Sequence, residues 1–395
     1  QVELALMRDE YHKVARAYVL YREQRAAQRY HTNKLKEQVG GKVSAMTVKK
    51  RDGSIELVSL DKITNRVSVL STGLAIDPII VAQKAIPGLY NEITTTEIDN
   101  YLAETSAALT VEHPDYSNLA ARIKANALHK ETPGFVIANK LLYEDGLLSQ
   151  EYYSKVKDNA ETIESLIDYD QDYNFDYFAL TTLMRAYLLK YKGKVIERPQ
   201  DLWMRVALTI ASDEFNYEKV KHAYSALSRG YYTHATPTLF NSGTTHSQLS
   251  SCYLNTFDDS IDGIFEGAWQ EARKSKFAGG LGFDVTNFRS SGAHIKGTNG
   301  TSSGLVPWLK IYNDLLVAVN QGGKRPGAGC AYLEPWHLDI EEFLDLKKNT
   351  GDERRRCHDM NTSNWIPNLF LEYIEKDKDW YLFSPSDVRD LHETY

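Results

Sequence analysis

Cys252 is the residue of this sequence best placed for redox chemistry. It follows Ser250 and Ser251 in the segment HATPTLFNSGTTHSQLSSCYLNTF, at the start of a run that predicts a β-strand. Hydroxyls and backbone amides at the beginning of a strand can bind a phosphate, and an exposed thiol there can exchange electrons. A lone cysteine is more often a small buried hydrophobic residue, so the segment by itself leaves both interpretations open.

Two glycine-rich segments follow the cysteine. The first, FRSSGAHIKGTNGTSSG, contains Arg289 and Lys296, and the second, VNQGGKRPGAG, contains Gln321, Lys324 and Arg325. Glycine, hydroxyl and cationic residues together suit the binding of phosphates by a mobile backbone. Neither segment matches GxxxxGK(S/T), so neither is a P-loop. One such segment alone is a weak signal, and two that follow the same cysteine are a stronger one.

A third cluster of chemically active residues lies nearer the start of the chain. The segment VKKRDGSIELVSLDKI places the cations of residues 49–51 beside the dipeptide Asp52-Gly53, and it puts Lys62 at the start of a predicted helix. Cations gathered at a glycine turn can hold a triphosphate through charge-assisted hydrogen bonds. A basic hairpin that is merely solvated would have the same spacing, so both interpretations stay open at this point.

Local patterns predict the elements around this third cluster. Asp-Gly between two runs rich in β-branched residues predicts a hairpin over residues 46–60. Thr95 or Thr96 is predicted to cap the helix TEIDNYLAETSAAL, and a further helix is predicted from Tyr116 to about Lys130. These elements would bring the cations of the hairpin close to the ends of helices.

The rest of the chain divides into stretches of different composition. Residues 1–30 carry an apolar stripe at helical spacing, and the polar stretch that follows predicts a linker. The stripe has no preceding segment to cover it, so an upstream domain is expected. Residues 136–230 are predicted to be mostly helical. From Tyr231 to about Gly329 the composition predicts short strands and glycine-rich loops, and helical patterns return over residues 333–348 and 364–376.

Composition and charge exclude several classes of protein. The 395 residues include 46 Lys and Arg and 53 Asp and Glu, a net charge of −7, which argues against a dedicated binder of nucleic-acid polymers. Three cysteines are too few for a disulfide framework and favour a reducing, cytoplasmic location. No apolar run approaches the roughly 20 residues that span a membrane.

Glu334, His337 and Asp339 have the residue types of a metal site, but capping and packing is the preferred interpretation, so no metal site is predicted.

Taken together, these segments resemble the large subunit of class I ribonucleotide reductases. The stretch from Val48 to about Lys130, including ITTTEI and PDYSNLAARI, is similar to the ATP cone of that family. ATPTLFNSGT…QLSSC and YLEPWHLDIEEFLDLKKNTG resemble the first part of its ten-stranded α/β barrel. The resemblance implies an α/β fold with five parts: the last helix of a preceding cone (1–30), a linker (31–45), an ATP cone (46–135), a helical domain (136–230) and the first part of the barrel (231–395).

The resemblance implies a role for each residue near Cys252. The matching cysteine of the family is one of two thiols that reduce the 2′ carbon of a ribonucleoside diphosphate and become a disulfide. Thr236, Thr238 and Ser251 would hold the diphosphate, and Gly280 would let the backbone approach the ribose. We therefore expect Cys252 at the edge of a barrel strand, facing a pocket that contains these hydroxyls, with both glycine-rich segments beside it.

The resemblance also implies two effector sites. At the specificity site, a deoxynucleoside triphosphate or ATP, with Mg²⁺, would bind to the first glycine-rich segment, and the second segment would bias which ribonucleotide is reduced. The residues implied there are Asp259, Arg289, Lys296, Gln321, Lys324 and Arg325. In the cone, ATP or dATP would set overall activity. The residues implied in the cone are Lys50, Arg51, Glu56, Ser59, Lys62, Thr95 and Lys130.

The family works as an assembly, and the resemblance implies partners. These are a homodimer or higher oligomer, a small (beta) subunit whose metal centre supplies the radical, and thioredoxin or glutaredoxin as reductant. The radical cysteine of the family lies in an Asn-x-Cys-x-Glu motif, which does not occur here, and the second reducing cysteine is also missing. Cys330 and Cys357 are predicted to be structural.

We therefore predict a chain that is inactive alone, as a fragment, a partly described subunit or one half of a split enzyme with a companion chain. A class II enzyme with adenosylcobalamin and a nucleotide-sensing regulatory protein built on the cone are the alternatives.

Overall fold

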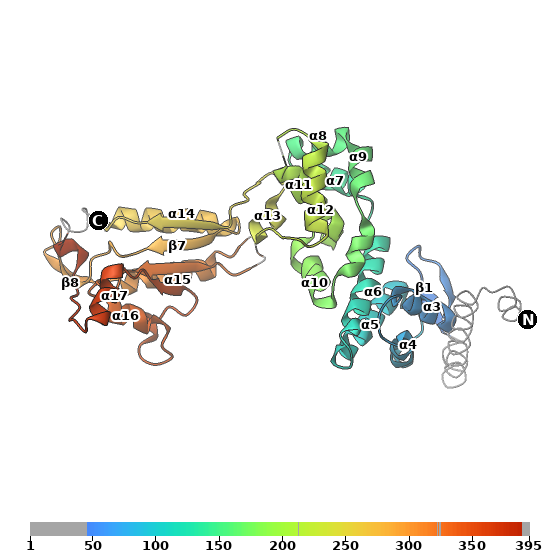
Figure 1. Ribbon diagram of the computed structural model, residues 1–395, viewed down its shortest axis with the longest axis horizontal. Coiled ribbons are helices and arrows are strands. Elements are labelled where there is room, and N and C mark those ends of the chain that lie inside the picture. The colour runs from blue at the N-terminus through green and yellow to red at the C-terminus, as the bar shows by residue number, and fades with distance from the viewer. Residues whose placement is uncertain (1–45, 212, 322, 324, 389–395) are drawn as a thin grey trace, which may run out of the picture. The chain divides into compact units, whose positions relative to one another are not determined.

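The computed structural model describes residues 46–211, 213–321, 323 and 325–388. The chain forms two compact units, Gln1–Tyr232 and Thr233–Tyr395, and each is described by itself (Figure 1). The helix expected over residues 1–30 and the linker expected over residues 31–45 lie outside the described residues. Among the residues that are described, no helix combines the length and the apolar character needed to cross a membrane.

The first unit begins with a small sheet built on a tight turn. Strands β1 (Thr47–Lys49) and β2 (Ile55–Leu57) pair antiparallel, and β3 (Ile93–Thr94) joins β1 in parallel. At the turn, the amide of Lys50 donates to the carbonyl of Ser54 at 2.8 Å, and Gly53 has a φ of +85°. Glycine adopts this left-handed conformation without a steric penalty. The hairpin predicted over residues 46–60 is confirmed.

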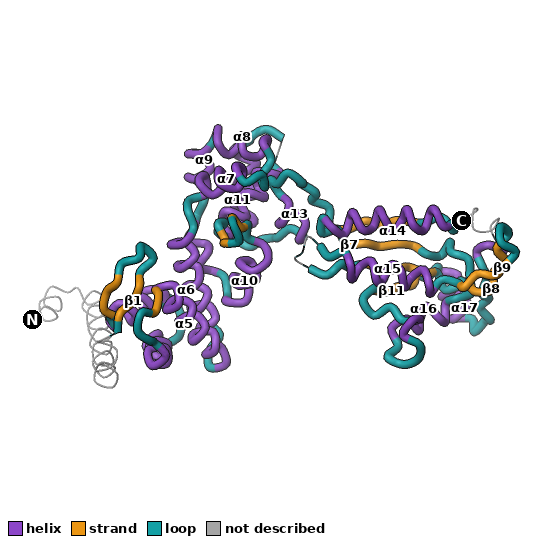
Figure 2. The backbone as a smooth tube through the Cα atoms, turned by 180° about the vertical axis from the view of Figure 1, so that it is seen from behind, coloured by secondary structure: helices purple, strands orange, loops and turns teal. Residues whose placement is uncertain are grey.

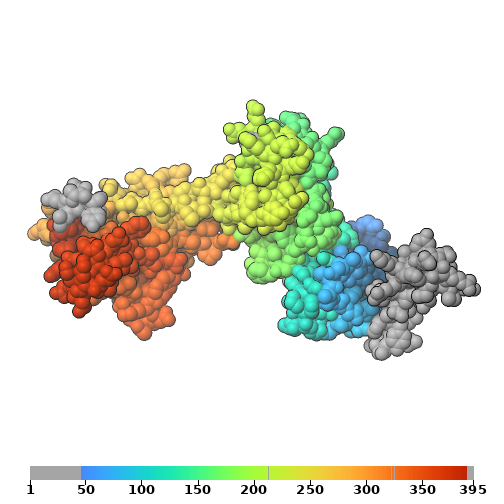
Figure 3. Space-filling view, in the orientation of Figure 1, coloured from blue at the N-terminus to red at the C-terminus, as the bar shows by residue number. Residues whose placement is uncertain are grey.

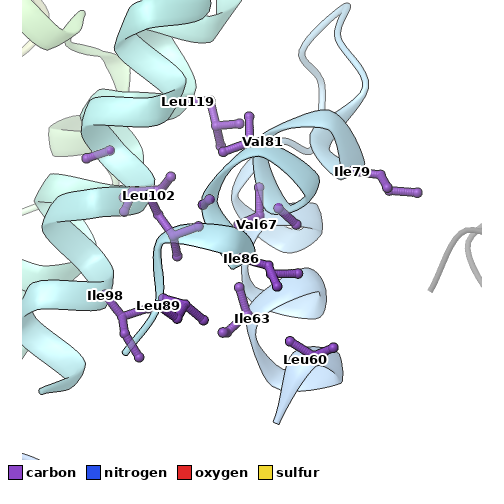
Figure 4. Packing of buried hydrophobic residues seen from close by; sticks show 14 of the residues in the cluster. Leu60, Ile63, Val67, Ile79, Val81, Ile86, Leu89, Ile98, Leu102 and Leu119 are labelled. Atoms are coloured by element: carbon purple, nitrogen blue, oxygen red, sulfur yellow. The ribbon is translucent and has the colours of Figure 1, made fainter. Parts of the chain in front are cut away.

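Four helices share one hydrophobic core with this sheet. Figure 4 shows Val67, Ile86 and Leu102, from three different elements, packed together and almost fully buried. Burying an apolar side chain of this size contributes roughly 1.5–3 kcal/mol, so this core is the main source of stability for the surrounding elements. The four helices are α3 (Leu60–Leu70), α4 (Pro78–Ala85), α5 (Thr95–Ala108) and α6 (Asp115–Glu131).

The residue that caps α5 is Thr94, and the prediction of Thr95 or Thr96 is wrong. The hydroxyl of Thr94 accepts from the amide of Glu97 at 3.1 Å, and the Glu97 carboxylate accepts from the amide of Thr94 at 2.8 Å. This reciprocal capping box requires a glutamate three residues after the cap. Of the three consecutive threonines, Thr94 is the one with that spacing.

The rest of the first unit is mostly helical, as predicted for residues 136–230 (Figure 2). Helix α6 contacts both α5 and α10, so it joins the sheet-containing part to the helical part. A short hairpin of β4 (Lys190–Tyr191) and β5 (Lys194–Val195) lies among the helices. The helices are α7 (Phe135–Glu144), α8 (Gln150–Asp158), α9 (Ala160–Leu166), α10 (Tyr177–Thr182), α11 (Pro199–Ile210) and α12 (Tyr217–Ser228).

The second unit is built on a four-stranded parallel sheet in the order β11-β10-β7-β6. Parallel neighbours need crossover connections, and α14 connects β6 to β7 while α15 precedes β10. A separate hairpin of β8 and β9 lies between β7 and α15 along the chain. The strands are β6 (Cys252–Thr256), β7 (Gly280–Asp284), β8 (Ser291–Ile295), β9 (Gly300–Ser303), β10 (Gly329–Leu333) and β11 (Asn361–Asn364). The helices are α13 (Thr236–Asn241), α14 (Ile261–Lys276), α15 (Val306–Ala318), α16 (Ile340–Leu344) and α17 (Asn368–Glu375).

Helix α14 is the main departure from the strands and loops expected between Tyr231 and Gly329. Its buried face includes Gly267, Glu271 and Ser275, which are small or polar, whereas Trp269 is exposed. Ile261, Phe265 and Trp269 do recur at helical spacing, but they are exposed, and the Gly-, Ser- and Thr-rich residues around α14 predict strands and loops instead. The parallel sheet with helical crossovers confirms the predicted α/β class.

Buried polar side chains join the end of α6 to the helical part of the first unit. The Nε2 atom of His129 lies 2.7 Å from the Oδ2 atom of Asp172, which is fully buried. Arg198 donates to the carbonyl of His129 at 3.2 Å and to the carbonyl of Thr132 at 2.9 Å. Carbonyls at the end of a helix lack partners within the helix, so these bonds both terminate α6 and hold the neighbouring segment.

The carboxyl group of Asp201 lies in the same polar region. It accepts from the hydroxyl of Tyr169 at 2.7 Å and from the amide of Arg198 at 2.9 Å. Burial raises the pKa of Asp201 to about 7, because these bonds do not offset the loss of hydration. In an unfolded chain this carboxyl loses its proton near pH ~4. The folded state therefore binds the extra proton between pH ~4 and ~7, and this contribution to stability is lost as the pH rises through that window.

We expect the substitution Asp201→Asn to flatten the pH dependence of stability. Relative to the variant, the wild-type protein should lose on the order of 1 kcal/mol or more between pH ~5 and ~7, since one pKa unit corresponds to about 1.4 kcal/mol. Urea unfolding at several pH values, followed by circular dichroism, measures this loss. Asp176→Asn removes an exposed carboxylate that caps α10 and is the control. Equal pH slopes for wild type and Asp201→Asn would contradict the raised pKa.

Candidate functional site

A cavity of about 260 Å³ lies between the hairpin and helices α3, α5 and α6 of the first unit. Its floor is apolar and its rim carries cations, which suits a nucleotide with a flat base and anionic phosphates. Six of the seven residues predicted for the cone line this cavity: Lys50, Glu56, Ser59, Lys62, Thr95 and Lys130. The apolar lining consists of Val48, Val58, Ile63, Ile98 and Leu102.

Glu56 neutralises two lysines of the cavity. Its Oε1 atom lies 2.9 Å from the Nζ atom of Lys50 and 2.9 Å from the Nζ atom of Lys62. The hydrogen bonds from Lys62 and Lys50 lower the pKa of the Glu56 carboxyl. All three side chains are about one third exposed or more, so water weakens both pairs and an incoming phosphate can compete for the lysines.

A second group of ion pairs includes residues that the sequence patterns did not single out. The Nη2 atom of Arg51 lies 2.9 Å from Asp99 Oδ2 and 2.9 Å from Glu131 Oε1. Arg66 also bonds to Asp99, whose side chain is 1% exposed. Arg66 follows Lys62 by four residues on α3, which places both on one face of the helix. That spacing is the signal by which Arg66 could have been found.

The residues that line the cavity leave it with an excess of positive charge. Four of the lining residues are cations, and Glu56 is the single anion among them. Burial lowers the pKa of Lys130, and the nearby guanidinium of Arg66 lowers it further. An anionic ligand would relieve this crowding of cations, so the electrostatics of the cavity favour a phosphate.

In the second unit, Cys252 begins the edge strand β6, and its thiol is exposed. Gly280 lies opposite it in the parallel register and donates its amide to the carbonyl of Ser251 at 2.7 Å. A Cβ atom at position 280 would lie 3.8 Å from the Sγ atom of Cys252, so Gly280 keeps that side of the thiol open. The hydroxyl of Ser251 lies 3.6 Å from the sulfur. This geometry matches the strand-edge position predicted for the thiol.

The two threonines predicted beside the thiol lie on α13. Thr236 is half-buried at the first position of that helix. Thr238 is buried, and its hydroxyl donates to the carbonyl of Leu249 at 3.1 Å. This bond fixes the segment that leads into β6, so Thr238 supports the position of the thiol from within the protein. The hydroxyl adjacent to the sulfur is that of Ser251.

The second glycine-rich segment lies at the same end of the sheet as the thiol. The amide of Gln321 donates to the carbonyl of Arg325 at 2.8 Å, which closes the segment into a tight loop. The side chain of Gln321 is buried and donates to the carbonyl of Gly279 at 3.4 Å, whereas Arg325 is exposed. Lys324 lies outside the described residues. The loop is thus held against the start of β7, next to the residue that faces Cys252.

The first glycine-rich segment lies at the opposite end of the sheet, and the expectation that both segments flank Cys252 is wrong. It forms the β8–β9 hairpin, which follows the C-terminal end of β7 (Figure 1). At its base, Arg289 Nε donates to Asp259 Oδ2 at 2.7 Å, and Lys296 is exposed at the hairpin turn. β6 and β7 are parallel and five residues long, which is about 13 Å at about 3.3 Å per residue, and this pair lies beyond the opposite ends of the strands from the thiol.

The three described thiols are free and differ in exposure. Cys357 is buried in the core of the second unit, and burial raises its pKa to about 11. Cys330 is half-buried, and burial raises its pKa as well. Through the register of β10 with Gly282 on β7, Cys330 lies on the same face of the sheet as Cys252.

Glu334, His337 and Asp339 do not gather around a common point. The Asp339 carboxylate accepts from the backbone amides of Ser291 and Leu305, and His337 bonds to a backbone carbonyl. Within the described ranges, no group of three or more His, Cys, Asp or Glu residues could hold a metal ion. These bonds support the capping interpretation of the three side chains.

Three family models match successive parts of the chain. Residues 46–131 match the ATP cone domain, residues 173–247 the all-alpha domain of ribonucleotide reductase, and residues 250–395 its barrel domain.

Curated relatives match most of the same residues of the chain. The chain is 46% identical over 372 residues to the ribonucleoside-diphosphate reductase large subunit of Dictyostelium discoideum, covering 90% of this chain and 42% of that protein. It is 44% identical over 365 residues to the large subunit of Arabidopsis thaliana (89% and 44% covered) and 46% identical over 363 residues to that of Caenorhabditis elegans (88% and 46% covered). The chain thus spans less than half the length of these relatives.

We expect Arg66→Ala to weaken ATP binding by about tenfold, since a hydrogen bond to a charged group contributes about 1.5–3 kcal/mol. The substitution removes a cation of the cavity and one partner of the buried Asp99. Calorimetric titration with ATP measures the loss. Lys84→Ala is the matched control, because Lys84 is an exposed cation that pairs with Glu112 outside the cavity. An unchanged ATP affinity in Arg66→Ala would show that ATP does not bind in this cavity.

We expect iodoacetamide at pH ~8 to modify Cys252 first and Cys357 last, because the exposed thiolate is the reactive species. Cys357 is both buried and shifted to a pKa of about 11, so little of it is ionised and reachable. Peptide mass spectrometry over a time course measures the order. Cys252→Ser is the control and should leave the labelling rates of the other two thiols unchanged. Labelling of Cys357 before Cys252 would contradict the exposures described above.

Proposed function

Because the chain belongs to the family of ribonucleotide reductase large subunits, we propose that it takes part in the reduction of ribonucleoside diphosphates to deoxyribonucleoside diphosphates. The observation that carries this proposal is the exposed thiol of Cys252 at the edge of β6, with Gly280 beside it. The reaction is proposed for the whole assembly. This chain supplies a reducing thiol and the regulatory nucleotide sites.

The proposed reaction replaces the 2′ hydroxyl of the ribose by hydrogen. Two thiols supply two electrons and two protons, the hydroxyl leaves as water, and the two sulfurs are joined as a disulfide. Cys252 is proposed as one of these thiols, and the second comes from a further part of the assembly. A radical from the metal centre of a small (beta) subunit starts the reaction, and thioredoxin or glutaredoxin reduces the disulfide again.

ATP or dATP is proposed to bind in the cavity of the first unit and to set overall activity. The excess of cations there supports this assignment, as does the apolar floor on which a base can lie. Lys50 and Lys62 approach the same carboxylate from two different elements. A phosphate in place of Glu56 would pair with both lysines, so binding would replace the two ion pairs of Glu56 by two ion pairs to the phosphate.

A deoxynucleoside triphosphate, with Mg²⁺ carried by its phosphates, is proposed to bind at Arg289, Asp259 and the β8–β9 hairpin. Helix α15 begins two residues after Gly304, where the hairpin ends, and Gln321 of the second segment follows its other end. One helix therefore connects the effector end of the sheet to the thiol end. Such a connection supports a coupling free energy between effector binding and the choice of substrate.

A homodimer or larger oligomer is proposed to form through α14. Ile261, Phe265 and Trp269 recur every four residues and are 68%, 51% and 58% exposed. Figure 3 shows α14 at the surface of the second unit, where Figure 1 labels it. An exposed apolar stripe of large side chains is typical of an interaction surface, and a second copy presents a matching one. The small subunit and a companion chain with the rest of the barrel would complete the assembly.

Nucleotide titration of the full chain tests the proposal. We expect dTTP to occupy a site in the second unit, and ATP and dATP to occupy the cavity of the first unit as well. Arg289→Ala should weaken dTTP binding at least tenfold, or by about 1.4 kcal/mol or more, and should leave ATP binding in the cavity unchanged. Arg66→Ala should do the reverse. Isothermal calorimetry measures the stoichiometry, and mass photometry measures the oligomer.

The titration also separates two candidate functions. A chain that binds ATP in the cavity and binds no dTTP would be a nucleotide-sensing regulatory protein built on the cone. The exposed Cys252 beside the second glycine-rich segment favours the reductase, because a sensor does not need a thiol in that position.

A further inference from the structure

One buried carboxylate closes the base of the β8–β9 hairpin. Asp339 is 4% exposed. The amide of Ser291 donates to its Oδ1 atom at 3.0 Å, and the amide of Leu305 donates to its Oδ2 atom at 2.9 Å. Ser291 is the first residue of the hairpin, and Leu305 follows its last strand after a single glycine. A side chain from a distant part of the sequence therefore fixes both ends of the hairpin.

His337 fixes the backbone of Asp339, which carries this carboxylate, and also holds the residue before Arg289. The ring of His337 is fully buried, its Nδ1 atom accepts from the amide of Asp339 at 3.0 Å, and its Nε2 atom donates to the carbonyl of Phe288 at 2.7 Å. These partners assign the ring proton to Nε2. Arg289 thus lies between two backbone positions, Phe288 and Ser291, that His337 and Asp339 hold in place.

Gly304 leaves the space that the carboxylate occupies. A Cβ atom at this position would lie 2.5 Å from Asp339 Oδ2 and 2.8 Å from the amide nitrogen of Ser291, and the φ of Gly304 is +79°. Both the space and the backbone conformation therefore exclude a side chain. The segments that contain Ser291, Gly304 and Asp339 therefore meet at the acceptor oxygens of Asp339.

The other end of the hairpin has a different character. Residues 296–299 at the turn are exposed, and the side chain of Arg289 is held by Asp259 rather than by the hairpin itself. The exposed turn can therefore contact a ligand, whereas the bonds of Asp339 fix the conformation of the base. Both oxygens of Asp339 accept backbone amides and the residue is almost fully buried, so its carboxylate faces the base of the hairpin rather than solvent.

We propose that Asp339, whose backbone His337 fixes, is a positioning residue for effector binding. It sets the place of Arg289 and of the hairpin base, and it does so without touching the nucleoside triphosphate. This inference rests on the proposed function, which puts the triphosphate at this hairpin. A role in folding alone would change the stability of the protein and leave the affinity of the folded protein for the triphosphate unchanged.

Asp339→Asn in the full chain tests the inference with little change of shape. The asparagine keeps one acceptor oxygen, but its NH₂ group meets the donor amide of Ser291 or Leu305, so one end of the hairpin is released. We expect the dissociation constant for dTTP to rise at least tenfold, measured by calorimetry well below the melting temperatures of both proteins. The affinity for ATP in the cavity of the first unit should stay unchanged, which shows that the first unit is folded, and an unchanged circular dichroism spectrum checks that the second unit is folded as well.

Two further variants complete the experiment. Gly304→Ala leaves Asp339 intact but places a methyl group against its Oδ2 atom, and it should weaken dTTP binding in the same way. Asp352→Asn is the matched control, because Asp352 is an exposed carboxylate that accepts the amide of Arg354 elsewhere in the second unit. It should bind dTTP like the wild type. Hydrogen exchange at the amides of Ser291 and Leu305, measured without nucleotide, should be faster in Asp339→Asn.

The outcomes separate the inference from the proposed function. Wild-type affinity for dTTP in Asp339→Asn, together with faster exchange at the hairpin base, would overturn the positioning role and leave the effector site standing. A wild-type chain that binds no dTTP would overturn the effector site and the positioning role together. Loss of dTTP and ATP binding alike in Asp339→Asn, with Gly304→Ala unaffected, would assign Asp339 to folding only and also overturn the inference.

Discussion

The parallel alignment of β6, β7 and β10 is the constraint on which the chemistry of the second unit depends. In such a sheet the N-terminal ends of the strands share one edge and the C-terminal ends share the other. Cys252 and the second glycine-rich segment lie at the first edge, and Arg289 with Asp259 lies at the second. The thiol and the Arg289–Asp259 pair therefore lie in separate places. The strands, α14 and α15 all run between these two edges and are the elements that could carry an influence from one to the other.

In the cavity of the first unit, carboxylates compensate only part of the positive charge. Glu56 pairs with two lysines, and Asp99 pairs with two guanidinium groups, of Arg51 and Arg66. The Glu56 pairs are exposed to water and are weak, whereas Asp99 is buried and its pairs resist separation. A ligand can thus displace Glu56 at little cost. The pairs of Asp99 keep the walls of the cavity in place while this happens.

Local signals made part of this architecture predictable, and long-range bonds made the rest unpredictable. The turn at Asp52-Gly53 is formed by neighbouring residues, so the sequence predicts it directly. The position of Cys252 at the start of a strand is likewise visible in the strand-like residues that follow it. The bonds from Asp339 to the hairpin join residues 48 and 34 positions apart, so no sequence window contains them. Helix α14 carries Ile261, Phe265 and Trp269 at helical spacing, so its sequence does contain a helix signal, whereas the Gly-, Ser- and Thr-rich residues around it predict strands and loops.

The last turn of α6 has a mechanical consequence. Lys130 lines the cavity, while the neighbouring residue His129 meets Asp172 in the helical part of the first unit. Consecutive residues of an α-helix point about 100° apart and share one hydrogen-bonded backbone, so a rotation of the helix turns both of them together. A rotation of α6 that moves Lys130 by a given angle moves His129 by the same angle. No loop separates the two contacts, so a rotation of this helical turn displaces the Cα atoms of both residues.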